Sequence, residues 1–134
     1  MLNKFKCCSN ADLAMFLVRL ALAAAFITHG VAKLSNMEGT VTFFASLGFS
    51  AFWAYLVSWL ELAGGLLMLI GLWTCLAGTV LAIIMLMAII EVKYQMGFLG
   101  GWELDLTLLL SSLAVVFGGP GKYSLGCQCP ACKK

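Results

Sequence analysis

Four long apolar segments, separated by short polar or glycine-rich connections, dominate the hydrophobic pattern of this chain. We place them at residues 12–34, 52–73, 75–92 and 102–118. Segments of roughly 17–25 apolar residues are long enough to cross a bilayer as helices. Backbone N–H and C=O groups find no water inside lipid, so spanning segments of this kind must be helical. The pattern therefore predicts an all-α fold, an integral membrane bundle of four transmembrane helices.

The connection between the first two segments carries a weaker helical pattern. Phe43, Phe44 and Leu47 fall on one face at helical spacing, as in a short amphipathic helix lying in the membrane interface. An ordinary packed loop is the alternative reading of such a short signal. We therefore expect a short interfacial segment between the first and second transmembrane helices.

Composition agrees with a membrane protein. Of the 134 residues, 63% are hydrophobic and only 10% are charged, whereas a soluble domain would carry about 25% charged residues. The formal net charge is +2, and no basic run stands out beyond the last two lysines. These values exclude nucleic acid as a partner and make membrane lipid the expected surrounding.

Lysine distribution predicts the orientation. Four crossings place both ends of the chain on one side of the membrane, and that side carries five lysines: Lys4, Lys6, Lys122, Lys133 and Lys134. Positive residues favour the cytoplasmic side. We expect a cytoplasmic N-terminal segment at 1–11, a four-span bundle at 12–118 and a cysteine-rich cytoplasmic tail at 119–134.

Charged residues inside the apolar segments need partners, because an isolated charge is costly at membrane depth. Counting about 1.5 Å per helical residue places Arg19 about 10 Å and Glu61 about 16 Å from the cytoplasmic end. An arginine side chain can bridge that difference in depth. The spacing predicts a structural ion pair between Arg19 and Glu61 that joins the first two spans.

A second group of polar residues collects toward the opposite face of the membrane. His29, Glu103 and Asp105 are the candidate catalytic residues of a polar pocket that would handle a quinone head group, a proton or a small solute. The alternative is a structural tether without chemistry. Lys33, Glu91 and Lys93 are expected at the rim, with their charged ends in water.

Six cysteines lie mostly at the chain ends, and the C-terminal three are closely spaced. Cys127, Cys129 and Cys132 are candidate ligands of zinc, Cu(I) or an iron–sulfur cluster, and they could also run thiol–disulfide exchange. The alternative is a set of free terminal thiols, which is the ordinary state in a reducing cytoplasm.

Several motifs taken together resemble the DoxX family over residues 12–125. The first is R-x9-H-G-x2-K-L, and the second is E-x2-G-G-x3-L-x-G-L, which runs from Glu61 to Leu72. G-W-E-L at 101–104 and G-P-G-K-Y-S-L at 119–125 complete the set, and the last is the most specific. Two features depart from the family pattern, namely Gly126, where the family commonly has Asp, and the cysteine-rich tail.

This resemblance implies a four-helix protein of a bacterial or archaeal inner membrane, linked to thiosulfate:quinone oxidoreductase and to membrane thiol-redox assemblies. The implied function is a subunit of a membrane redox complex that links thiol or sulfur-compound oxidation to the quinone pool. Other subunits of such a complex are the implied partners, and quinone is the implied small molecule. The alternatives are a non-catalytic assembly subunit and a protein that handles metal or a solute through its thiols.

Overall fold

The structure, a computed structural model, describes residues 10–126. Its elements in chain order are α1 (Ala11–Ser35), α2 (Met37–Ser46), α3 (Ala51–Ile70), α4 (Thr74–Ala88), η1 (Ile89–Lys93), η2 (Tyr94–Met96), η3 (Phe98–Trp102) and α5 (Glu103–Gly118). Within the described residues there is no strand.

Four helical stretches are long and apolar enough to cross a membrane. They are Ala11–Ser35, Ala51–Ile70, Thr74–Met96 and Phe98–Gly118. The predicted all-α bundle of four spans is confirmed. The third and fourth spans are longer than predicted, because short helical turns, η1 and η2 after α4 and η3 before α5, extend them. The backbone leaves the helical conformation at Gly97 between the spans and again at Leu99 and Gly100 within η3.

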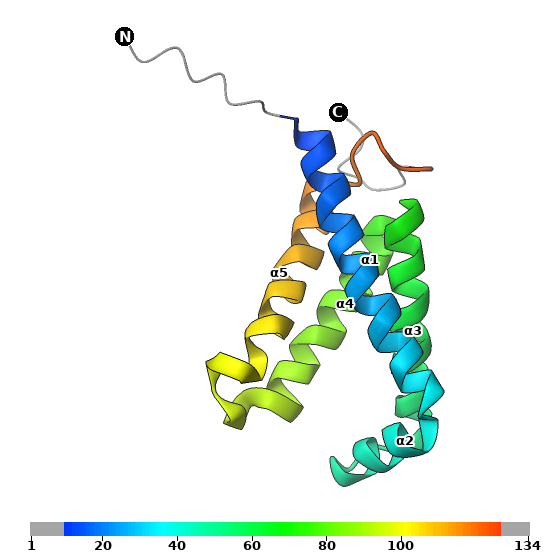
Figure 1. Cartoon of the computed structure of the whole chain (residues 1–134), viewed down its shortest axis with the longest axis vertical. Helices are drawn as coiled ribbons and strands as arrows, with labels where there is room; N and C mark the ends of the chain where they lie inside the picture. The colour runs from blue at the N-terminus through cyan, green and yellow to red at the C-terminus, as the bar shows by residue number, and fades with distance from the viewer. Residues whose placement is uncertain (1–9, 127–134) are drawn as a thin grey trace.

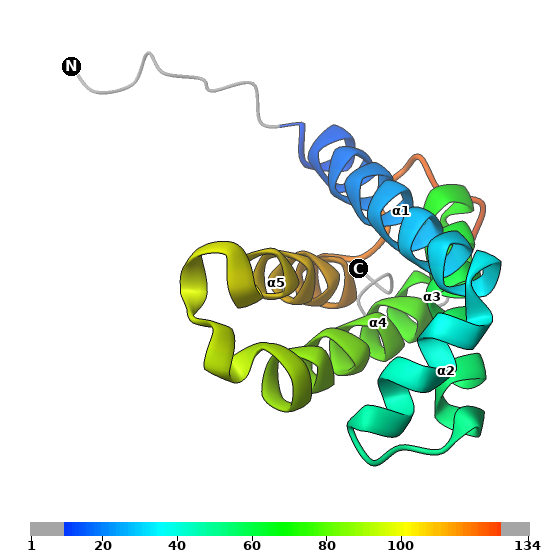
Figure 2. The same ribbon diagram turned by 60° about the horizontal axis from the view of Figure 1, so that its bottom comes forward.

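The spans form two pairs that meet at one end of the molecule (Figure 1). α1 packs along α3, and α4 packs along α5, while the contacts between the pairs are fewer. The pairs diverge toward the end where α2 lies, and the turned view shows the same opening (Figure 2). The described ends of the chain, before α1 and after α5, lie together at the opposite end (Figure 1).

Two glycines allow the close approach of α1 and α3. A Cβ at Gly30 would come within 2.7 Å of the Leu62 backbone nitrogen, and one at Gly65 within 2.9 Å of the Ile27 nitrogen. Small residues let helix backbones approach closely in membranes, where packing replaces the hydrophobic driving force. The two contacts set the antiparallel register of α1 and α3, with Gly30 beside Leu62.

A single apolar core fills the region where the four spans meet. Its buried members are Leu22, Ala23, Phe26, Met68, Ala77, Leu81, Met85, Leu108 and Val115. Many large apolar side chains remain exposed on the outer faces, including Leu17, Trp59, Leu76 and Leu110. Outward-facing apolar surface of this extent is what a lipid-facing bundle presents.

The short helix predicted between the first two spans is present as α2. Asn36 begins it, because its side chain accepts a hydrogen bond from the Gly39 N–H at 3.2 Å. Asn is among the best residues at this capping position. α2 packs against α1 and α3 and runs across the end of the bundle (Figure 1).

Candidate functional site

Arg19 is a buried charge near the end of the bundle where the described chain ends meet. It is 1% exposed, and its guanidinium donates hydrogen bonds to four backbone carbonyls. The acceptors are Met68 O at 3.0 Å, Leu69 O at 3.2 Å, Pro120 O at 2.9 Å and Tyr123 O at 2.8 Å. Arginine suits this role because it presents five N–H donors in a rigid plane.

These contacts complete the hydrogen bonding at the C-terminal end of α3. The last four carbonyls of an α-helix have no partner within the helix. Here Leu67 O accepts from the N–H groups of Gly71 and Leu72, the two residues that follow α3. Met68 O and Leu69 O accept from Arg19, and Ile70 O accepts from Leu125 N–H at 3.3 Å. All four carbonyls are therefore paired, and the negative end of the helix dipole faces a cation.

The segment after α5 is fastened to the start of α1. Asp12 accepts from the Lys122 N–H at 3.1 Å and lies 3.6 Å from its ammonium group. The rings of Phe16 and Tyr123 are 5.7 Å apart. The G-P-G-K-Y-S-L motif therefore wraps around Arg19, with two of its carbonyls on the guanidinium.

The predicted ion pair between Arg19 and Glu61 is wrong. Arg19 donates to carbonyls at the end of α3, and Glu61 accepts a hydrogen bond of 2.6 Å from Lys33. The depth estimate assumed that α1 and α3 begin and end at the same level. In the observed register Gly30 lies beside Leu62, so Lys33, and not Arg19, reaches Glu61.

The Lys33–Glu61 ion pair joins α1 and α3 at the opposite end of the bundle. Glu61 is 1% exposed, whereas the Lys33 side chain is 30% exposed. Only one carboxylate oxygen of Glu61 is paired: Oε2 is buried and has no hydrogen-bond partner among the described residues. Buried polar atoms are nearly always satisfied, so an unpaired carboxylate oxygen calls for an explanation.

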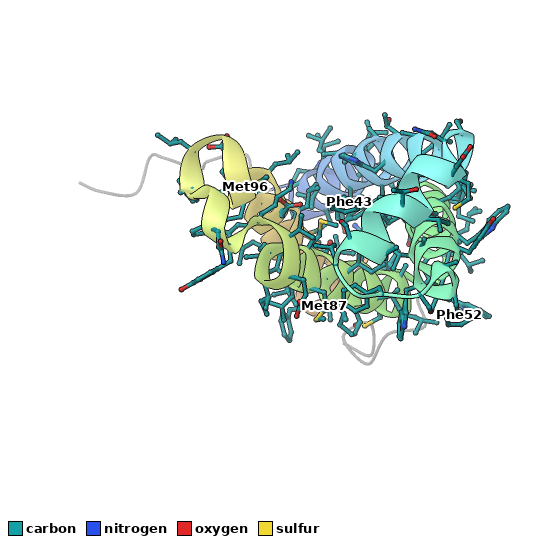
Figure 3. All side chains as sticks on the ribbon, turned by 90° about the horizontal axis from the view of Figure 1, so that it is seen from below. Phe43, Phe52, Met87 and Met96 are labelled. Carbon is teal, nitrogen blue, oxygen red and sulfur yellow. The ribbon has the colours of Figure 1, made fainter. Side chains whose placement is uncertain are left out.

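A shallow hollow of about 350 Å³ lies beside this ion pair, in the corner between α1 and α2. Its lining consists of His29, Ala32, Lys33, Asn36, Gly39, Thr40, Phe43 and Phe44. His29 lies one helical turn before Lys33, is exposed, and makes no hydrogen bond or ion pair within residues 10–126. Seen from this end, Phe43 lies toward the middle of the molecule and Phe52 at its outer edge (Figure 3).

The two acids predicted to join His29 lie on the other pair of helices. Asp105 in α5 is buried and accepts a hydrogen bond of 2.7 Å from Lys93 in η1. Glu103 begins α5 and accepts from the Gly100 N–H at 3.3 Å. Among the described residues no hydrogen bond or ion pair connects His29 with either acid. The three predicted residues therefore lie at two separate places: His29 lines the hollow on α1 and α2, and Glu103 and Asp105 lie in the first turn of α5.

The predicted metal ligands Cys127, Cys129 and Cys132 lie outside the described residues. Within residues 10–126, no group of three or more His, Cys, Asp or Glu side chains could hold a metal ion. Cys75 is near the start of α4, where its thiol lies 3.7 Å from Val116 O.

Sequence reasoning missed two features of the site. Lys33 was expected at the rim, yet it is the partner of Glu61. The carbonyl contacts of Arg19 were also missed, although Gly71, which ends α3 with φ of +75°, marked the helix end that needed a donor. A Cβ on Gly71 would clash with Arg19 Nη2, which shows how closely the guanidinium approaches this turn.

The four apolar helices and their lipid-facing surface define a multi-pass membrane protein. The DoxX family model matches residues 14–94, and the chain belongs to the DoxX family. The chain is similar to a Bacillus subtilis (strain 168) protein named "Putative oxidoreductase CatD", with 38% identity over 108 residues that cover 81% of each chain. No solved structure matches the chain significantly.

Proposed function

We propose that this protein is the membrane subunit of a redox complex that passes reducing equivalents from a thiol or sulfur donor to the quinone pool. Membership of the DoxX family and the oxidoreductase name of the Bacillus relative support a redox role. The observation that carries the proposal is the hollow at the diverging end of the bundle, where His29, which has no hydrogen-bond or ion-pair partner within residues 10–126, lies beside the Lys33–Glu61 pair. Ionisable groups inside a membrane protein commonly mark functional sites.

The proposed reaction balances for a thiol donor. Two thiols lose two electrons and two protons to form a disulfide, and a quinone takes up the same electrons and protons to form a quinol. In this proposal His29 exchanges protons at the hollow, while Glu103 and Asp105 exchange them at the start of α5. Imidazole and carboxyl groups are the usual proton carriers in membrane proteins.

The length of α1 supports a role within a larger complex. Arg19 and Lys33 are fourteen residues apart, which corresponds to about 21 Å along a helix. In this proposal both chain ends are cytoplasmic, in a bacterial or archaeal inner membrane. There two of Cys127, Cys129 and Cys132 form a disulfide that receives two electrons and two protons from the donor, or the three thiolates bind a metal. Electrons from that side need a carrier to reach a quinone at the hollow, and partner subunits would supply it.

The test combines purification and turnover. We expect gentle detergent extraction to recover the chain in a stoichiometric membrane complex that reduces a soluble quinone analogue with a thiol donor. His29→Ala should slow this reduction while the complex remains assembled. If neither the complex nor the isolated chain reduces quinone with any thiol or sulfur donor, the redox proposal is wrong.

A non-catalytic assembly subunit is the second candidate, and the saturated contacts of Arg19 favour it. Four of the five N–H groups of Arg19 hold α3 and residues 120–123 to α1. Such a role needs only a rigid scaffold for redox partners. Unchanged turnover of an assembled complex that carries His29→Ala would favour this candidate over the first.

A further inference from the structure

The free hydrogen-bonding groups of the hollow are mostly donors. The Lys33 ammonium has three N–H groups and spends one on Glu61 at 2.6 Å. The Thr40 hydroxyl donates its one proton to the carbonyls of Lys33 and Asn36, at 3.1 and 2.9 Å. Asn36 Oδ1 accepts from the Gly39 N–H, and the amide NH₂ of Asn36 has no hydrogen-bond partner within the part of the chain that the structure describes. A ligand that fits this lining must offer acceptor oxygens.

The charges near the hollow distinguish a neutral ligand from an anionic one. Lys33 is neutralised by Glu61, so it is not a free cation. The Lys33–Glu61 pair carries no net formal charge, so it offers a phosphate group no uncompensated cation and favours neutral carbonyl oxygens.

The remaining walls of the hollow are aromatic and small. Phe43 and Phe44 of α2 contribute two rings whose centroids are 6.1 Å apart, and Ala32 and Gly39 leave room beside them. Aromatic faces favour a flat, conjugated ligand. A volume of about 350 Å³ suits the head group of such a ligand, since small-molecule sites begin at about 300 Å³.

We propose that this hollow binds the ring of a quinone, with Lys33 and His29 as donors to its carbonyl oxygens and Phe43 and Phe44 against its face. The proposal rests on the proposed function and deepens it by assigning the quinone to one corner of the bundle. Glu61 is the positioning residue that holds the Lys33 ammonium group. A quinone is neutral and carries acceptor oxygens on a flat ring, so it meets each requirement of the lining.

The test is photoaffinity labelling of the detergent-purified full chain with an azido-benzoquinone that carries a short isoprenyl tail. We expect the label within residues 29–44 by peptide mass spectrometry, and we expect excess unlabelled benzoquinone to displace it. Lys33→Met combined with Glu61→Gln removes the Lys33 donor without stranding a charge. This double variant should weaken labelling roughly tenfold or more, because a hydrogen bond from a charged donor is lost.

Two matched controls separate loss of the site from loss of folding. Lys122→Gln with Asp12→Asn removes an ion pair at the other end of the bundle and should leave labelling unchanged. Phe43→Ala should weaken labelling, whereas Phe52→Ala, an exposed aromatic at the same end, should not (Figure 3). Thermal unfolding of every variant confirms that each remains folded.

Three outcomes would overturn the proposal, and they differ in what they leave standing. Displacement of the label by vesicles of phosphatidylglycerol, but not by benzoquinone, would make the hollow a lipid head-group site. Displaceable labelling near Glu103 and Asp105 would move the quinone to α5 and leave the proposed function intact. Absence of any displaceable label from the chain and from its purified complex would remove both this site and the quinone-linked function.

Discussion

The buried charges near the two ends of α1 differ in how completely they are hydrogen-bonded. Arg19 donates four of its five N–H groups to backbone carbonyls, and the C-terminal carbonyls of α3 are all paired. Near the other end, the Lys33–Glu61 pair leaves Glu61 Oε2 without a partner, and His29 beside it is also unpartnered within the described residues. A charged residue in a membrane helix is therefore a weak sign of function by itself. Whether its hydrogen-bonding groups all have partners in the fold is a better indication of a functional role.

The largest effect should follow from Arg19→Ala. The change leaves four carbonyls without their donor, and each unsatisfied buried group costs about 1–3 kcal/mol. We expect a loss of roughly 5 kcal/mol in the free energy of unfolding, which most proteins of this size do not tolerate. Thermal unfolding in detergent micelles measures it. Arg19→Lys, which keeps the charge but not the planar fork, should recover only part of the loss.

Wild-type stability in Arg19→Ala would contradict this account, because it would mean that water or other groups replace the guanidinium. The hydrogen bonds of Arg19 would then not be what stabilises the C-terminal end of α3. Recovery of full stability by Arg19→Lys would show that a positive charge is enough to stabilise the C-terminal end of α3, and that the planar guanidinium donors are not needed.

A smaller effect is expected from Lys33→Ala at the other end. The change strands the Glu61 carboxylate, and removing one partner of a buried pair costs about 3–5 kcal/mol. Because Lys33 is 30% exposed, we expect a loss near the lower limit, about 3 kcal/mol. The double variant Lys33→Met, Glu61→Gln should lose no more than about 1 kcal/mol, since it leaves no unpaired charge. Chemical unfolding of Lys33→Met, Glu61→Gln and their double variant gives the coupling energy.

Equal destabilisation by the single and double variants would show that the pair contributes through its own attraction. In that case the unpaired Glu61 Oε2 would be a feature of packing, and the contrast with Arg19 would disappear.

The fold was predictable because its signals are local. Four apolar segments of membrane-spanning length predicted the spans, and the Phe43–Phe44 pattern predicted α2. The glycines around residues 97–101 marked the connection before the last span, although the winding of η1 to η3 was not foreseen. Length and periodicity determine such elements, and neither depends on how the helices are placed against one another.

The charge partners were not predictable in the same way, because they depend on register. α1 extends beyond the end of α3, so equal depth was the wrong assumption for Arg19 and Glu61 (Figure 1). The Gly30 and Gly65 contacts set the true register, and a difference of two or three turns exchanges one basic partner for another. The sequence also does not show which backbone carbonyls Arg19 will contact. Its one indication is Gly71, which marks the end of a helix whose last carbonyls need donors.

A smaller loss of stability is expected from a change at Gly71, which lies against Arg19 at the C-terminal end of α3. Gly71→Ala places a side chain on a left-handed residue and against Arg19, so we expect a loss of about 2–3 kcal/mol. Gly48→Ala is the matched control: its φ is +86°, but a Cβ there would meet nothing within 4 Å. That variant should lose only about 1 kcal/mol, the cost of the backbone conformation alone. Equal losses in the two thermal unfolding curves would show that Arg19 can move aside.

His29 should show the smallest effect on stability and a clear effect on function. Its side chain is exposed and makes no hydrogen bond or ion pair within residues 10–126, so His29→Gln should change the free energy of unfolding by less than about 0.5 kcal/mol. If His29 exchanges protons at the hollow, the same variant should slow quinone reduction by about 10²-fold or more in the isolated complex, because glutamine can donate a hydrogen bond but cannot carry a proton. Stopped-flow reduction of a quinone analogue, measured beside thermal unfolding of the same sample, separates the two quantities. A stable variant with unchanged turnover would mean that His29 is a surface residue without a catalytic role. The hollow between α1 and α2 would then take no part in proton transfer.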